Sequence, residues 1–166
     1  METATVADLA WMAGVFDSDS SIFIMKQHRK DRDRSHNYIL RISVEGADDI
    51  KANEIMRITK LGSTNVGKVH VQGRSNTLKW QVDGRKAMSI LKAVLPFMRV
   101  KLKQAEAAIV FQETTKKHWR KMEPHDYAEQ ERYYQLLKDL KSYRKLGNKV
   151  PQYQAASKLY NIETYQ

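Results

Sequence analysis

The stretch Trp11-Met12-Ala13-Gly14-Val15-Phe16-Asp17-Ser18-Asp19-Ser20-Ser21-Ile22 places two carboxylates just past the end of an apolar helix predicted over residues 6–16. The C-terminal end of a helix carries partial negative charge, so an acid there costs about 0.3–1 kcal/mol. A bound divalent cation would offset this repulsion. Asp17 and Asp19 by themselves are also compatible with a helix that ends in an Asp/Ser turn and binds no metal.

The same predicted helix carries small side chains at Ala10, Ala13 and Gly14. Small residues allow a second helix to approach closely. If that helix comes from a second copy of the chain, two Asp19 side chains converge on one symmetric site. Such a pair would hold metal ions that activate water and stabilise the leaving oxygen in phosphodiester hydrolysis.

Downstream of this helix, strand and helix patterns follow one another in the order αββαββα, counted with the first helix. Strands are expected over residues 21–29, 37–44, 66–72 and 77–82, and helices over residues 48–62, 83–95, 101–119 and 127–146, with a short last helix from Pro151. The predicted fold class is therefore α+β, with a curved antiparallel four-stranded sheet and added C-terminal helices. We expect one domain over residues 1–166, with a core at about 6–145 and an extension at about 146–166.

The predicted sheet gathers polar side chains on one face, because apolar Tyr38, Leu40, Ile42 and Val44 alternate with the other side chains of their strand. Residues 63–82 contain three basic residues and no acid. Arg, Lys, Gln and Asn are the side chains that read base edges in the major groove, which admits a β-ribbon. An ordinary solvated face is the alternative. The candidate nucleic-acid contacts are Lys26, Gln27, Arg29, Lys30, Arg32, Arg34, Asn37, Arg41, Ser43, Lys68, His70, Gln72, Arg74, Thr77, Lys79 and Gln81.

The totals favour an anionic partner and exclude several classes of site. The 29 Lys and Arg against 19 Asp and Glu give a net charge of +10, which favours nucleic acid first and a membrane surface second. The absence of cysteine excludes disulfides and thiolate zinc sites, and the five histidines show no metal-ligand spacing. The apolar runs are too short to span a bilayer, and the N-terminal residues do not resemble a secretory signal. We expect a location inside the cell, in the cytoplasm or the compartment that holds the target DNA.

Two segments resemble a known family. Residues 12–20, MAGVFDSDS, resemble the LAGLIDADG motif of a family of homing endonucleases, and residues 95–105, LPFMRVKLKQA, are similar to a Pro-Phe, Lys-rich segment of its single-motif, group I intron members. The element order over about residues 6–145 also fits that family. One motif in a short chain implies a homodimer. The resemblance implies a saddle-shaped sheet that binds a long, pseudo-palindromic duplex, and double-strand cleavage with Mg²⁺ or Mn²⁺ at the dimer interface.

The resemblance also implies roles for individual residues. Asp19 matches the metal-binding carboxylate of the motif, and the main-chain carbonyl of Ser18 would help to coordinate the metal. Lys101 matches a basic residue that stabilises charge on the scissile phosphate or polarises solvent. Glu45 is the candidate for a polar residue near the attacking water, with Gly46 as the alternative aligned position. The implied dimer-interface residues are Ala10, Ala13, Gly14 and Asp17, of which Asp17 is expected to shape the turn rather than bind metal.

The chain departs from the family pattern at three positions. Ser18 stands where Gly or Ala is usual, Ser20 stands where Gly is usual, and the relatives tend to have Gln near Glu45. These departures leave open a catalytically weak or silent DNA-binding regulator, or an RNA maturase of the same fold. A basic structural or membrane-surface protein is a further alternative. Retention of both Asp19 and Lys101 favours the nuclease.

Overall fold

The computed structural model describes residues 4–28, 36–46, 50–67, 77–115 and 123–145, and its element order confirms the predicted αββαββα arrangement with helical additions. The elements are α1 (Val6–Asp19), β1 (Ser20–His28), β2 (His36–Gly46), α2 (Ile50–Thr59), β3 (Ser63–Gly67), β4 (Thr77–Asp83), α3 (Gly84–Val94), the 3₁₀ turn η1 (Leu95–Phe97), α4 (Leu102–Thr114) and α5 (Pro124–Lys145). No helix in these ranges is long and apolar enough to cross a bilayer. The expected helix from Pro151 and the extension 146–166 lie outside the described residues.

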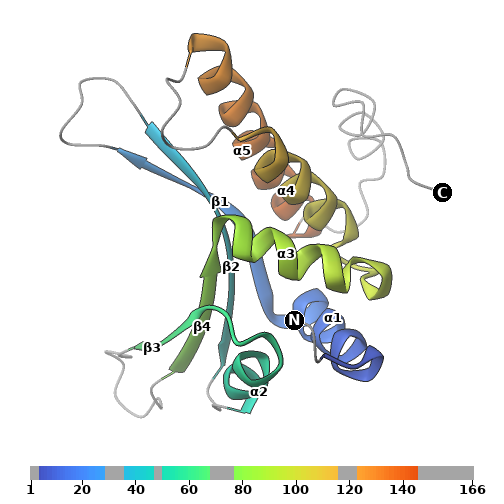
Figure 1. Ribbon diagram of the computed structural model, residues 1–166. Helices are drawn as coiled ribbons and strands as arrows, with labels where there is room; N and C mark the ends of the chain where they lie inside the picture. The colour runs from blue at the N-terminus through green and yellow to red at the C-terminus, as the bar shows by residue number, and fades with distance from the viewer. Residues whose placement is uncertain (1–3, 29–35, 47–49, 68–76, 116–122, 146–166) are drawn as a thin grey trace.

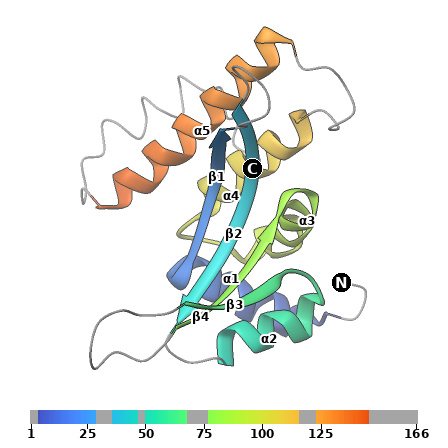
Figure 2. The same cartoon turned by 90° about the vertical axis from the view of Figure 1, so that its left-hand side faces the viewer.

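The four strands form one antiparallel sheet in the order β1-β2-β4-β3. Figure 1 shows α1, α3 and α4 on one side of this sheet, and Figure 2 turns the other side toward the viewer, with β2 curving along its length. The predicted alternation in β2 is confirmed, since Tyr38, Leu40, Ile42 and Val44 are all buried beneath the helices. The α+β fold with a curved antiparallel sheet is therefore the observed one.

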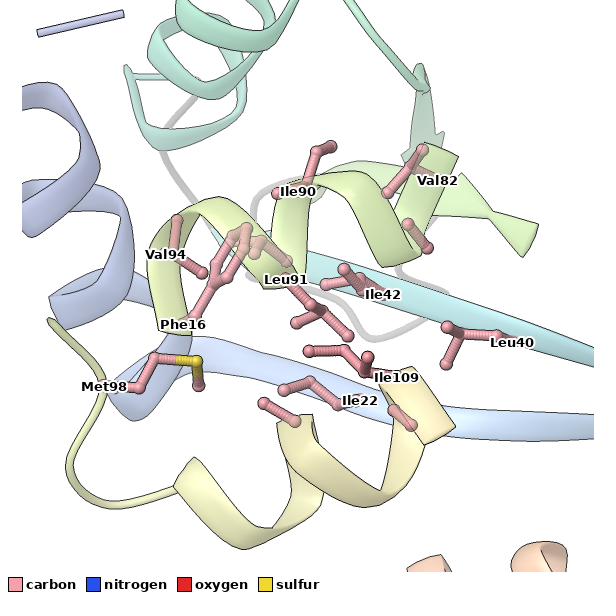
Figure 3. Packing of buried hydrophobic residues seen from close by; sticks show 14 of the residues in the cluster. Phe16, Ile22, Leu40, Ile42, Val82, Ile90, Leu91, Val94, Met98 and Ile109 are labelled. Carbon is pink, nitrogen blue, oxygen red and sulfur yellow. The ribbon is translucent and has the colours of Figure 1, made fainter. Parts of the chain in front are cut away.

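The core lies between the covered sheet face and the helices. Phe16 of α1, Ile42 of β2 and Leu91 of α3 are fully buried, and Figure 3 shows them converging with side chains from β4 and α4. The ring of Phe16 stacks on Trp80, whose indole N–H donates to the Leu61 carbonyl at 3.0 Å. Because α1 contributes buried side chains up to Phe16, the acids that follow are held at a fixed place beside the sheet.

Several element boundaries differ from the prediction, and two of these differences bear on the site and on the sheet. Helix α1 continues to Asp19 instead of ending at Phe16, so its acids lie within the last turn rather than past it. Strand β3 begins at Ser63 instead of Val66, because the chain turns sharply at Gly62, where φ is +98° and a Cβ would lie 2.6 Å from the Gln81 carbonyl oxygen. Only glycine fits such a turn. Residues 68–72 of the predicted strand lie outside the described residues.

The C-terminal helix α5 is fixed to the sheet by a polar contact as well as by Leu136 and Leu137, which are buried. The Glu131 carboxylate accepts hydrogen bonds from Lys26 Nζ at 2.7 Å and from the Tyr38 hydroxyl. Burial raises the pKa of Glu131, but hydrogen bonds from Lys26, Tyr38 and Gln135 outweigh this effect and lower the pKa to about 2 from its ordinary 4.5. The ionised carboxylate is therefore the form that holds α5 in place.

We expect Glu131→Gln to lower stability at neutral pH by about 1–2 kcal/mol, after allowance for solvent screening of a partly exposed group. Because the folded pKa is depressed, the Glu131 contribution is complete above pH 4.5 and is lost as pH falls toward about 2. Urea unfolding at pH 7 and pH 3 measures the difference between variant and parent, which should shrink at the lower pH. Glu113→Gln, in an exposed pair with Lys92, is the control and should change little. A difference independent of pH would contradict the assignment.

Candidate functional site

The end of α1 is held by a buried lysine. Lys101 is 5% exposed, and its Nζ donates to the carbonyl oxygens of Phe16 at 2.7 Å, Ser18 at 3.4 Å and Ser20 at 2.6 Å. A cation at a helix C-terminus offsets the partial negative charge there. The repulsion that suggested a metal from the sequence is thus relieved within the chain, so it is not an independent reason for metal binding. The Lys101 ammonium thus lies against the carbonyl groups at the end of α1 and is not exposed on an open surface.

Asp17 lies in the last turn of α1, and its side chain contacts the segment that precedes α4. Its two carboxylate oxygens accept main-chain N–H groups across the fold, from Arg99 at 2.7 Å and from Lys101 at 2.8 Å. Lys101 is the residue directly before α4, so Asp17 caps that helix start from outside. Asp17 and Lys101 therefore bind the end of α1 and the start of α4 to each other.

Asp19, the last residue of α1, points toward solvent with its side chain 39% exposed. Its carboxylate accepts a hydrogen bond from Lys51 Nζ at 2.8 Å, and this bond, more than any other cause, lowers the pKa of Asp19 below its ordinary value. Lys51, near the start of α2, was not among the predicted site residues. Asp19 is consequently an accessible carboxylate that stays ionised.

The groups near Asp19 that could bind a metal are few. Within the described ranges there is no group of three or more His, Cys, Asp or Glu side chains that could hold an ion. Mg²⁺ is often bound by one or two carboxylates together with substrate phosphates. One exposed, ionised Asp19 per subunit, with the Ser18 carbonyl beside it, fits such a site only when a second subunit and a phosphate complete it.

Two adjoining hollows lie along β1 and α5, and we call them together the α5 groove; Asp19 lines only the first. The first, of about 350 Å³, is lined by Ser18, Asp19, Ser20, Ser21, Ile22, Lys101, Gln104 and Lys141. The second, of about 410 Å³, is lined by Ser21, Phe23, Ile24, Ser43, Glu45, Lys79, Tyr134, Leu137, Lys138 and Lys141. Ser21 and Lys141 line both hollows. Asp19 and Lys101 thus share one hollow, whereas Glu45 lies in the other.

The open face of the sheet carries most of the described candidate contacts. The register pairs Gln27 with Asn37 and Ser43 with Gln81, which places these side chains on the face opposite the core. Each is partly exposed or exposed except Ser43, which is 7% exposed. This face lies toward the viewer in Figure 2.

Several polar groups on this face already contact one another. The Arg41 guanidinium donates to both carboxylate oxygens of Asp83, each at 2.6 Å. The Thr77 hydroxyl donates to Glu45 at 2.8 Å, and Lys79 is the cross-strand partner of Glu45. The sheet face therefore contains two acids, Asp83 and Glu45, beside its cations.

Lys26 requires a correction. It shares its side of β1 with Ile22 and Ile24, and its ammonium binds Glu131 of α5, so it does not belong to the open face with Gln27. A second set of candidates, Arg29, Lys30, Arg32, Arg34, Lys68, His70, Gln72 and Arg74, lies outside the described residues.

The outer face of α1 also differs from the expected one. Ala10 and Gly14 are exposed, and a Cβ added at Gly14 would meet nothing within 4 Å. Ala13 is 0% exposed and packs inside the subunit, so it is not available to a partner helix. Trp11, 38% exposed and not predicted, lies next to this small-residue stripe.

Lys101→Met is expected to destabilise the protein by about 2–4 kcal/mol, because the carbonyls at the end of α1 lose a buried charged donor. The methionine keeps the length of the apolar stem. Chemical denaturation monitored by circular dichroism measures the change in the free energy of unfolding. Lys92→Met is the matched control, since Lys92 is an exposed lysine of α3 paired with Glu113 and should cost no more than about 1 kcal/mol. Equal losses in the two variants would contradict the helix-capping role.

No protein-family model and no curated protein matches the sequence. Solved structures do match the fold, and they are homing endonucleases. The first is I-CvuI in complex with the I-CreI target, at 17% identity, a TM-score of 0.57, and coverage of 82% of this chain and 98% of that one. The archaeal intron-encoded enzyme I-Vdi141I, complexed with DNA, matches at 13% identity and a TM-score of 0.55, with 76% and 96% covered.

The meganuclease I-SmaMI, bound to uncleavable DNA, matches at 16% identity and a TM-score of 0.58. The match covers 81% of this chain but only 46% of the I-SmaMI chain. At these identities the likeness is one of fold. The chain therefore has the fold of homing endonucleases, and the matched part covers nearly all of the I-CvuI chain and about half of the I-SmaMI chain.

Proposed function

We propose that the protein is a site-specific DNA endonuclease that acts as a homodimer and hydrolyses phosphodiester bonds with a divalent metal bound at Asp19. The observation that carries this proposal is the exposed, ionised Asp19 at the C-terminal end of α1, the helix that also carries the exposed small residues Ala10 and Gly14. The fold shared with DNA-bound homing endonucleases supports it. The net charge of +10 per subunit supports a polyanionic partner.

Two subunits are needed because one subunit supplies a single exposed carboxylate at the site. Pairing through the stripe of Ala10 and Gly14 brings two α1 helices together, and with them the two Asp19 side chains at their ends. The match to about half of the I-SmaMI chain supports an assembly of two such units. A two-fold dimer then reads a pseudo-palindromic target.

The residues divide the chemical work as follows. Asp19 and the Ser18 carbonyl bind Mg²⁺ or Mn²⁺, which, when bound, activates water and stabilises the leaving oxygen. Lys101 and Asp17 fix the helix end that presents Asp19. Lys51 lowers the pKa of Asp19 and so keeps its carboxylate ionised, the form that would hold a cation. Glu45, which lines the adjoining hollow with Lys79, would order solvent there.

The open sheet face supplies the sequence-reading surface. Gln27, Asn37 and Gln81 present amide groups there, and Lys79 adds a cation. Arg41 is available to DNA only if its bidentate pair with Asp83 opens or turns, since both carboxylate oxygens hold it. We therefore assign direct readout first to the amides and Lys79, and a positioning role to Arg41 in the absence of DNA.

Selection of cleaved sequences from a randomised duplex library in Mg²⁺ tests the proposal. The expected result is enrichment of one long site with approximate two-fold symmetry, cut on both strands. The same selection in Ca²⁺, which replaces Mg²⁺ as a probe of binding, recovers bound but uncut sites. Enrichment by binding with no cleavage in either Mg²⁺ or Mn²⁺ would favour the silent DNA-binding regulator. Binding to structured intron RNA in preference to duplex DNA would favour the maturase.

A further inference from the structure

Helix α5 forms one wall of the α5 groove and contributes cations that no other assignment uses. Lys141 lines both hollows, and Lys138 lines the hollow that also contains Lys79 and Glu45. Both lysines are exposed. Lys138, Lys141 and Tyr134 are spaced to lie on one side of the helix, and Lys138 Nζ lies 5.3 Å from the centre of the Tyr134 ring.

This wall is fixed relative to the sheet. Leu137, on the same helix, is 3% exposed and lines the groove floor together with Phe23 of β1. Six residues earlier on α5, Glu131 binds Lys26 of the edge strand β1 and Tyr38 of the neighbouring strand β2. Leu137 and Glu131 therefore both fix α5 against the sheet, and the backbone positions of Lys138 and Lys141 are fixed with it.

The two lysines that line the hollow of Asp19 differ in how accessible their ammonium groups are to a ligand. The Lys101 ammonium is buried against the carbonyls at the end of α1, whereas Lys141 is an exposed residue of the facing wall. A phosphate that enters this hollow from solvent meets Lys141 without displacing a main-chain contact. The role that the family resemblance gave to Lys101 thus fits the position of Lys141 better.

We propose that Lys141 binds a backbone phosphate of the nucleic acid next to Asp19, and that α5 extends the DNA-binding surface from the sheet into the α5 groove. Lys138 binds the backbone farther along the same groove, toward Lys79. The inference rests on the proposed endonuclease function. It makes Lys141 a group that touches the substrate and Lys101 a positioning residue.

The test compares Lys141→Gln and Lys141→Arg with the parent dimer. Binding to a random-sequence duplex in Ca²⁺ is measured by fluorescence anisotropy over a range of salt concentrations. Loss of one phosphate contact per subunit makes the salt slope shallower by about 1 per subunit, and Lys141→Arg restores it. Affinity at low salt falls about tenfold in Lys141→Gln. Lys92→Gln removes a lysine of α3 that pairs with Glu113, and should leave the slope at the parental value.

Single-turnover cleavage of the selected site in Mg²⁺ provides the second measurement. In Lys141→Gln the single-turnover cleavage rate at saturating protein should fall by a larger factor than the DNA affinity does, since the lost contact lies beside the metal-binding carboxylate. An unchanged salt slope in Lys141→Gln, or a slope equally reduced in Lys92→Gln, overturns the inference. A parent protein that binds but does not cut overturns the proposed nuclease, and the salt slopes then still decide whether Lys141 contacts the backbone.

Discussion

Asp19→Asn is expected to abolish cleavage of the selected DNA site while leaving DNA binding largely unchanged. The amide keeps the size of the side chain but removes the charge that binds a divalent cation. Metal-ion stabilisation of a developing charge is worth several kcal/mol, so the single-turnover rate should fall about a thousandfold or more. Binding should persist because the sheet face and the α5 groove supply most of the cations that meet phosphate.

The loss of activity in Asp19→Asn should not arise from unfolding. Asp19 and its partner Lys51 are each 39% exposed, and an exposed ion pair contributes about 0–1 kcal/mol. The thermal midpoint should therefore remain near that of the parent. Glu113→Gln, the same chemical change at the exposed pair with Lys92, is the control and should cut normally. Cleavage retained by Asp19→Asn would remove this carboxylate from the mechanism.

A direct reading of metal binding complements the rate. Mn²⁺ that binds the complex of the parent dimer with an uncleavable duplex lowers the electron paramagnetic resonance signal of free Mn²⁺, and Asp19→Asn should abolish this decrease. Lys51→Met should instead strengthen Mn²⁺ binding, because the Asp19 carboxylate no longer accepts the hydrogen bond that the Lys51 ammonium donates at 2.8 Å. The two variants therefore move the same measurement in opposite directions.

The sheet and its covered face were predictable because their patterns are local. In β2 the apolar residues alternate with a period of two, and one helix-covered face is the physical reason for that period. The same period of two could have placed Lys26 correctly, because its side chain points to the same face of β1 as buried Ile22 and Ile24. Likewise Ala10 and Gly14, four residues apart, share a helix face, whereas Ala13 shares the buried face of Met12 and Phe16.

The electrostatics of the site depend on contacts between distant parts of the chain. Lys101 reaches Phe16 across 85 positions, and Lys51 reaches Asp19 across 32. No sequence periodicity links such residues. The family resemblance pointed to Lys101 as a site residue, but it did not predict that the Lys101 side chain is buried. Lys141 belongs to the end of α5, whose position depends on the Glu131 contact with the sheet. Its place beside Asp19 follows only once the helices are packed.

The other large effect is expected at Gly14, where Gly14→Gln should abolish dimerisation and double-strand cleavage without unfolding the subunit. Nothing lies within 4 Å of a Cβ at this exposed position, so the first atom of a side chain meets no obstacle inside its own subunit. Replacing a glycine inside a helix should even stabilise the folded subunit, by about 0.5 kcal/mol. Any damage must then come from what packs against α1 in the assembly.

The paired helices of the proposed dimer would have to accommodate two glutamines at their closest approach. Overpacking of this kind costs about 1–3 kcal/mol at each site, or about 2–6 kcal/mol for the symmetric pair. Analytical ultracentrifugation should show a dimer for the parent and a monomer for the variant at the same concentration. Gly14→Ala should weaken the dimer less, because a methyl group intrudes less than a longer chain does.

Ser89→Gln is the control, since it places the same side chain at an exposed position of α3 and should leave both assembly and cutting intact. The monomeric Gly14→Gln protein should unfold cooperatively, which separates lost pairing from lost folding. It should also bind DNA with a shallower salt slope, because one subunit meets half as many phosphates as two. Since each subunit contributes a single Asp19 to the site, a Gly14→Gln protein that stays dimeric and cuts both strands would mean that α1 does not mediate pairing, and that the two carboxylates meet by another route.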